Sequence, residues 1–290
     1  GDERVSLAAR RALVAHGQAG FEAARAALGD VSLRMSLRWQ LPRTLAQFAP
    51  QPAADALLAR LTEEGDGMTR YRIIRALETL VAREPALELA RPTLQRVIGE
   101  TLARAYRLLD ARMSLTQGAA EEPARNTPGH ELLVHVLRHK EQNACGRLLR
   151  VLGLAHPAAD FARIRRGLRN GSEKTRANSI ELVASALEQP LRSAVLGLID
   201  ELSDEQRLSS AGSYYRPQHL DYEAQLERML TRESAALQDF TAFHVGELGL
   251  SRFAPLLVTM VEREPGRADL VRALGRLQVP PQVGTELAPC

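Results

Sequence analysis

The fold is decided by the stretch at residues 65–77, GDGMTRYRIIRAL, in which a Gly/Asp turn runs into a helix-forming segment. The phrase recurs as a turn with Gly or Asp, then a small or basic residue, then Leu or Val seven positions later. The small or basic residues of its four copies are Ser6, Arg34, Arg70 and Arg176. The first two steps are 28 and 36 residues, and the third, 106 residues, is close to three such steps. This period is typical of stacked helix pairs, each of which buries its apolar face against its neighbours.

The composition indicates a folded helical chain without a membrane span. Of 290 residues, 45% are hydrophobic, 25% charged and only 4% aromatic, which excludes disorder for most of the chain and favours helix packing by Leu, Ala and Val. The longest apolar stretch, near residues 253–261, falls far below the ~18 residues of a membrane span. Cys145 and Cys290 are too few for a disulfide framework, which indicates a reduced, cytoplasmic setting.

Helical periodicity fills almost the whole chain, without strand-like alternation of Val, Ile and Thr. The expected helices cover residues 2–16, 20–28, 31–48, 51–64, 68–83, 86–116, 129–155, 158–169, 173–187, 190–201, 218–232, 234–249, 251–263 and 266–277. Pro42 is predicted to kink its helix rather than end it. Residues 117–129 are expected to form a mobile insert, 203–218 a second long loop, and 280–290 a disordered tail.

The helix pairs resemble HEAT repeats. Five segments between Arg38 and Asp200 further resemble one particular kind of HEAT region. They are LPRTL at 41–45, TRYRIIRAL at 69–77, RVLGL at 150–154, RGLR at 166–169 and RANSIEL at 176–182. These segments are similar to the HEAT region that follows a nucleotide-translocase-like (ATP/ADP antiporter type) membrane domain in bacterial proteins. The resemblance implies a soluble cytosolic module of a longer chain, whose transported substrate would bind in the membrane part. Because Gly1 opens directly on a helix-start signal without Met, the chain is expected to be a fragment.

These observations together predict an all-α, right-handed α-solenoid of about six or seven HEAT-like helix pairs over residues 1–279. We expect arginines near the helix starts, at Arg34, Arg70 and Arg176, to form a structural ladder. Each would pair with an Asp or Glu of a neighbouring turn, such as Asp30, Asp66 or Glu173.

The sharpest chemical feature is the segment from Asp160 to Arg176, with six basic and two acidic residues. Its arginines on one helix are Arg163, Arg165, Arg166 and Arg169. Such a patch suits phosphate, an acidic helix or an anionic membrane surface. The alternative is a solvated arginine face, in a chain whose 38 basic residues include only two lysines, as GC-rich codon usage would also produce. The segment lacks aromatic side chains that stack on bases, which disfavours nucleic acid.

The second helix of each pair lines the concave face of a solenoid, so residues just after each turn are expected to face a groove. On this geometry the predicted partner contacts are Arg38, Arg72, Arg75 and Asn178. Arginines in a groove favour a partner with an acidic surface, either an Asp/Glu-rich helix or phosphate. The alternative is that the insert at 117–129 folds back and fills the groove with Glu121 and Glu122.

Two smaller constellations remain. Tyr214, Tyr215 and Arg216 form either an interface hot spot or a cover over the end of the core. Glu131, His135 and His139 share a helical face, but the pattern has no third zinc ligand and fits the polar flank of an apolar stripe.

No nucleophile with an adjacent base and no Gly-rich phosphate loop occurs in the sequence. We therefore predict a non-catalytic protein-interaction scaffold with no cofactor, metal or small-molecule substrate, which meets a membrane only through flanking segments. The alternative is an anion- or nucleic-acid-binding helical-repeat module that uses the arginine-rich face.

Overall fold

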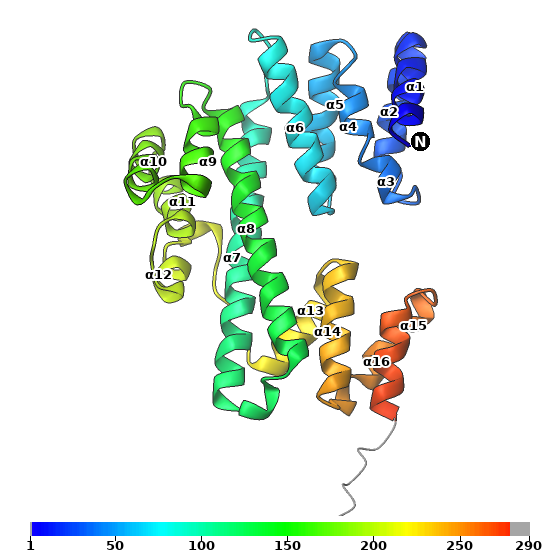
Figure 1. The fold of residues 1–290 in the computed structure, drawn as a ribbon, viewed down its shortest axis with the longest axis vertical. Coiled ribbons are helices and arrows are strands. Elements are labelled where there is room, and N and C mark those ends of the chain that lie inside the picture. Colours follow the sequence, from blue (N-terminus) through cyan, green and yellow to red (C-terminus); the bar gives the residue numbers. More distant parts are fainter. Residues whose placement is uncertain (1, 279–290) are drawn as a thin grey trace, which may run out of the picture. The chain divides into compact units, whose positions relative to one another are not determined.

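The computed structural model describes residues 2–278, and this part of the chain is helical with no strands (Figure 1). Its α-helices are α1 (Asp2–Ala15), α2 (Gly17–Gly29), α3 (Met35–Arg38), α4 (Leu41–Leu45), α5 (Pro50–Glu63), α6 (Gly67–Arg83), α7 (Arg91–Glu121), α8 (Pro128–Ala155), α9 (Phe161–Asn170), α10 (Glu173–Ala186), α11 (Leu191–Ile199), α12 (Asp204–Ser209), α13 (Tyr222–Arg232), α14 (Ala235–Glu247), α15 (Ala254–Arg263) and α16 (Ala268–Gln278). Three short 3-10 helices are η1 (Pro123–Arg125), η2 (Gly212–Tyr214) and η3 (Ser251–Phe253). The all-α prediction is confirmed for the described residues.

The described chain separates into two compact units. Unit 1 contains residues 2–107 and 141–216, and unit 2 contains residues 108–140 and 217–278, so α7 and α8 contribute to both. Within unit 1, neighbouring helices pack as the pairs α1/α2, α5/α6 and α9/α10; within unit 2, α13 packs on α14 and α15 on α16. The pairs bury mainly Leu, Ala, Val and Ile, as the low aromatic content indicates.

The predicted helix at 31–48 is broken rather than kinked. It forms two short helices, α3 and α4, with Pro42 in the first turn of α4. In a continuous helix the proline ring would meet the carbonyl four residues earlier, that of Arg38. The chain therefore ends α3 at Arg38 and begins a new helix at Leu41.

The prediction of a mobile insert at 117–129 is wrong. Helix α7 continues to Glu121, η1 follows, and α8 begins at Pro128. Gly118 lets α7 continue against the Tyr222 ring, because a Cβ at this position would lie 2.6 Å from that ring. Ala119 is buried beside it. Because this part of α7 packs through Gly118 and Ala119, its sequence shows no helical period of large apolar residues. The hydrophobic pattern therefore does not predict a helix here.

The acidic end of this segment also has local partners. Glu121 accepts a hydrogen bond from Gln117 at 2.9 Å, and Glu122 pairs with Arg125 at 2.8 Å. Arg125 in turn donates to the carbonyl of Gly118. Both glutamates therefore have partners within their own segment.

The second long loop, 203–218, also contains helix. Ser203 accepts a hydrogen bond from the Gln206 amide while the Gln206 side chain accepts from the Ser203 amide, a capping box that starts α12. The helix η2 follows at 212–214. The tail predicted at 280–290 lies outside the described residues.

Four arginines of unit 1 occupy one repeated position, four residues after the N-cap of the second helix of a pair. They are Arg38 in α3, Arg70 in α6, Arg176 in α10 and Arg207 in α12. Each donates to a carbonyl in the last turn of the preceding helix, namely those of Leu28, Leu61, Leu168 and Gly197. These bonds satisfy carbonyls that a helix end leaves without a partner and place a cation at the negative end of the dipole.

The predicted ladder therefore exists in a changed form. Arg34 is exposed and is itself the N-cap of α3, so Arg38 holds the equivalent position. The acidic partners come from other places than expected: Arg176 pairs with Glu201 at 3.1 Å, and Arg70 approaches Glu100 at 4.0 Å. Arg38 pairs with Glu64 and Arg207 with Glu141, and the bonds that all four arginines share are those to backbone carbonyls, which a residue pattern does not reveal.

Arg176→Met should lower the free energy of unfolding of unit 1 by about 1–2 kcal/mol, because charge-assisted bonds to the Leu168 and Ile199 carbonyls are lost. Arg166→Met, an exposed arginine of α9, is the matched control and should change it by less than about 0.5 kcal/mol. Urea unfolding followed by circular dichroism measures both. Equal effects would show that the bonds at the repeated position add nothing.

Candidate anion-binding face of unit 1

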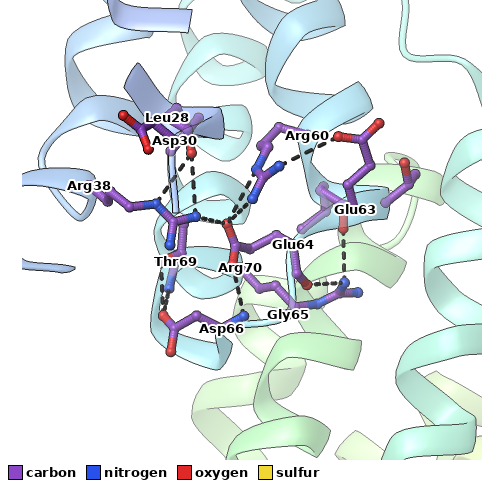
Figure 2. Close-up of polar contacts among 12 residues, drawn as sticks. Leu28, Asp30, Arg38, Arg60, Glu63, Glu64, Gly65, Asp66, Thr69 and Arg70 are labelled. Atoms are coloured by element: carbon purple, nitrogen blue, oxygen red, sulfur yellow. Dashed lines mark hydrogen bonds and ion pairs between the residues drawn. The ribbon is translucent and has the colours of Figure 1, made fainter. Parts of the chain in front are cut away.

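A buried ion-pair network surrounds the turn between α5 and α6 (Figure 2). The Glu64 carboxylate lies between Arg38 at 2.5 Å and Arg60 at 3.0 Å, and it also accepts a hydrogen bond from the Asp66 amide at 2.8 Å. The side chains of Arg38 and Glu64 are both only 3% exposed. The prediction that Arg38 contacts a partner is therefore wrong, because its guanidinium is committed to Glu64 and to the Leu28 carbonyl.

Further along α6, three arginines converge on one carboxylate. Glu78 pairs with Arg150 of α8 at 2.5 Å and with Arg165 of α9 at 3.1 Å. Arg75, one turn earlier on α6, approaches it at 3.6 Å. The Arg150 guanidinium also lies over the Tyr71 ring, 5.2 Å from its centroid. We call these three arginines with Glu78 the Glu78 cluster.

The Glu78 cluster carries two positive charges in excess of its carboxylate. Arg150 and Arg165 are mostly shielded from solvent, with side chains 13% and 24% exposed, whereas Arg75 is 55% exposed. Burial and the neighbouring Arg150 lower the pKa of Arg165, against the opposing effect of Glu78. An incoming anion would relieve this repulsion, and the planar arginine fork suits carboxylate and phosphate oxygens.

A second group of arginines surrounds the start of α6. Arg104 of α7 donates to the Gly65 carbonyl at 3.1 Å, and the Arg147 guanidinium of α8 lies 3.6–3.8 Å from the position of a Cβ on Gly67. Burial, then Arg104 and Arg70, lower the pKa of Arg147 to about 10. Among residues 2–278, the Arg147 side chain has no hydrogen bond or ion pair. We call Arg70, Arg104 and Arg147 the α6-start cluster.

The four arginines predicted to form a patch on α9 have different surroundings in the structure. Arg165 joins the Glu78 cluster, whereas Arg163, Arg166 and Arg169 are exposed. Their spacing of three residues places these three on one solvated side of α9. The segment is therefore not a single patch, since its arginines point to different surroundings.

The remaining predicted groove residues lie on α6 and α10. Arg75 belongs to the Glu78 cluster. Arg72 is half-buried, and its Nε is buried without a hydrogen-bond acceptor in the part of the chain described. Asn178 is exposed on α10.

The two tyrosines after α12 are half-buried, and Arg216 is exposed. The Tyr214 ring lies against α7, 3.9 Å from the position of a Cβ on Gly99, and burial raises the pKa of its hydroxyl. This placement favours the view that Tyr214 covers the core. Tyr215 follows in extended backbone.

Sequence reasoning missed Glu78, Arg104, Arg147 and Arg150. The available signal was the pair Arg147 and Arg150, which lie nearly one turn apart on α8 and therefore on the same side as each other. Glu78 and Arg150 are 72 residues apart, and only the packing of α6, α8 and α9 brings them together.

Unit 2 contains a buried polar network of a different kind. The Tyr222 hydroxyl lies 2.5 Å from His244 Nε2 and 3.1 Å from His130 Nδ1. On the other side of the His244 ring, Nδ1 lies 3.4 Å from Glu247 and 3.2 Å from Thr127. The order Glu, His, Tyr resembles a nucleophile relay, but Tyr222 is 3% exposed and His244 is fully buried, so no substrate reaches the hydroxyl. The network therefore joins the α7–α8 connection to α13 and α14.

Among residues 2–278, no group of three His, Cys, Asp or Glu side chains is arranged to hold a metal ion. His135 and His139 are both exposed on α8. In the same range, no helix is both long enough and apolar enough to cross a membrane.

Comparison with known proteins identifies no relative of this chain. No family model matches the chain, and no curated protein and no solved structure is significantly similar to it. The resemblance to HEAT repeats and to the region beside translocase-like membrane domains stays a prediction. The chain is therefore described as an all-α protein whose unit 1 carries two arginine clusters.

Proposed function

We propose that the chain is a non-catalytic binding module in which unit 1 holds an acidic protein segment on the Glu78 cluster. The observation that carries this proposal is the convergence of Arg75, Arg150 and Arg165 on one carboxylate. Ion pairs with a structural role usually balance their charges. An excess of arginine that is shielded from solvent makes the binding of an anion more favourable. Carboxylates of Asp and Glu on a partner provide that charge.

The architecture supporting this role is proposed to be a right-handed, HEAT-like solenoid of six or seven helix pairs. Its support is the stacking of neighbouring pairs in unit 1 and the arginine that recurs four residues after the N-caps of α3, α6, α10 and α12. The proposed cytoplasmic setting rests on the low cysteine count and on the sequence resemblance, and the proposed bacterial origin and link to a larger membrane protein rest on the resemblance alone.

Arg75→Gln combined with Arg165→Gln should weaken binding of a labelled glutamate-rich peptide by about tenfold or more. Each arginine supplies a charge-assisted bond, and about 1.4 kcal/mol corresponds to a factor of ten. Fluorescence anisotropy at fixed ionic strength measures the affinity.

The matched control is Arg163→Gln combined with Arg166→Gln. It removes the same charge from the exposed side of α9. The proposal expects at most a twofold effect of this control. Equal weakening by the two double variants would indicate attraction by net charge, without a binding site at Glu78.

Nucleic acid is the second candidate, favoured by the Tyr71 ring beneath Arg150. Binding of single-stranded or duplex DNA should then fall steeply with salt, because each neutralised phosphate releases counterions. A steep slope that disappears in the Arg75 and Arg165 double variant would assign the Glu78 cluster to nucleic acid and overturn the protein-partner proposal.

A further inference from the structure

We propose that the α6-start cluster is a phosphate-monoester site, with Arg104 and Arg147 as the arginines that contact the phosphate. This inference deepens the proposed function: the acidic partner would carry a phosphorylated serine or threonine beside its carboxylates. Arg147 and Arg150 lie nearly one turn apart on α8, so the α6-start and Glu78 clusters lie along the same side of this helix.

The geometry begins with the turn from Gly65 to Gly67. Arg104 reaches the turn through the Gly65 carbonyl, and the Arg147 guanidinium rests beside Gly67, the first residue of α6. The first N–H groups of a helix have no acceptor within the helix and form the positive end of its dipole. Cations normally avoid this position, yet Arg147 lies at it.

The charges around the turn leave a positive excess. Besides the three arginines, the carboxylates of Glu64, Asp66 and Glu100 face this region, and Glu64 is already paired with Arg38 and Arg60. The Asp66 carboxylate is already bound by the amide and hydroxyl of Thr69 at 2.7 and 2.9 Å. Glu100 lies 4.0 Å from Arg70 and its side chain is 42% exposed. Because Arg38 and Arg60 neutralise Glu64, Arg104, Arg147 and the α6 dipole are the groups that would attract a dianion, against the Asp66 and Glu100 carboxylates.

The roles of the three arginines differ. Arg70 is buried, and its Nη1 donates to the carbonyls of Leu61 and Glu64. Arg70 would therefore attract the phosphate through its positive charge without contacting it. Arg104 donates to the Gly65 carbonyl and has a further interaction besides this bond. Arg147 is half-buried and has no acceptor among the described residues, so its whole guanidinium fork is available to phosphate oxygens.

The first test is titration with inorganic phosphate, followed by the fluorescence of Trp39. This residue is the single tryptophan of the chain, and its indole N–H lies 3.4 Å from the Asp66 carboxylate, within the same turn. We expect a saturable change for the wild type and at least tenfold weaker binding for Arg147→Gln. Arg163→Gln, an exposed arginine, should keep the wild-type affinity. No saturable change, or the same affinity in Arg147→Gln, would overturn the site.

Thermal unfolding separates ligand binding from a structural role. Without phosphate, Arg147→Gln should melt at or above the wild-type temperature, because a half-buried cation between like charges is removed. With phosphate, only the wild type should gain stability, because binding to the folded state alone raises the melting temperature. A lower melting temperature for Arg147→Gln without phosphate, together with an equal phosphate shift in both proteins, would make Arg147 a structural residue.

The last experiment compares one acidic peptide with and without phosphoserine. The wild type should bind the phosphorylated form at least tenfold more tightly, Arg147→Gln should bind both alike, and the Arg75 and Arg165 double variant should weaken both equally. The advantage should grow as the pH rises through about 6, where the phosphate becomes a dianion. If phosphorylation adds nothing while the Glu78 cluster still binds the peptide, this inference fails and the proposed function stands. If phosphorylation strengthens binding but the Arg75 and Arg165 double variant binds like the wild type, the phosphate site stands and the proposed function fails.

Discussion

Glu64→Gln should lower the free energy of unfolding of unit 1 by about 3–5 kcal/mol. The Glu64 carboxylate is 3% exposed and is the acidic partner of Arg38, which is equally buried. Glutamine retains an acceptor for the Asp66 amide but loses the charge. The Arg38 guanidinium would then remain in the interior without a counter-charge, and this uncompensated cation is the main source of the loss.

A matched control lies next to it in the sequence. Glu63 also pairs with Arg60, at 3.5 Å, but its side chain is 71% exposed. Glu63→Gln should therefore change the free energy of unfolding by less than about 0.5 kcal/mol. Urea unfolding followed by Trp39 fluorescence compares both variants within unit 1, which contains that tryptophan.

The double variant Arg38→Met, Glu64→Gln tests the cause. If the cost of Glu64→Gln comes from the stranded guanidinium, removal of Arg38 as well should recover most of the lost stability. A double variant that is as unstable as Glu64→Gln would show that the carboxylate acts mainly through its other bonds, to Arg60 and the Asp66 amide.

Local signals predicted much of the helical organisation correctly. The expected helix at 173–187 is observed as α10, which Ser172 caps through the Thr175 amide. The repeat pattern aligns Asp30 with Asp66 and therefore places Arg34, instead of Arg38, at the repeated position. The Asp30 side chain instead accepts from the amide and hydroxyl of Ser32, which forms a local turn and delays the start of α3 until Arg34.

The binding face was less predictable, because it depends on packing between distant helices. The dense arginine run on α9 predicts a binding patch there, yet of that run only Arg165 pairs with a residue of another helix. Glu78, which organises the cluster, is one of many glutamates on helix surfaces and has no local motif. Composition gives an excess of arginine but does not show where a shared carboxylate will gather three of them.

Unit 2 should lose stability as the pH falls below about 6.5, the ordinary pKa of an unfolded histidine. Burial lowers the pKa of both His130 and His244 in the folded protein, and each imidazole lies within the Tyr222 network. A depressed pKa means that the unfolded chain binds protons first on acidification. Stability is therefore full above that pH and declines below it, by about 1.4 kcal/mol per pH unit for each histidine.

Neighbouring charges modify this dependence without reversing its direction. Glu247, 3.4 Å from His244, favours the protonated ring, and Glu131 does so for His130, but burial is the larger effect for each. Arg125, whose guanidinium lies 4.6 Å from the centre of the Tyr222 ring, adds positive charge to the same network. Protonation of both histidines would then place three cations around one buried tyrosine.

Hydrogen exchange of α13 and α14, corrected for the intrinsic effect of pH, measures the prediction within unit 2. Protection should fall between pH 7.5 and 5.5 in the wild type, and His130→Gln should make this fall shallower because one of the two titrating rings is gone. His135→Gln, an exposed histidine of the same helix α8, should leave the dependence unchanged. Protection that is constant with pH, or a dependence altered as much by His135→Gln as by His130→Gln, would show that the buried network does not link protons to folding. A fall that is retained by His135→Gln and reduced by His130→Gln would instead identify the imidazoles around Tyr222 as the groups whose protonation opens unit 2.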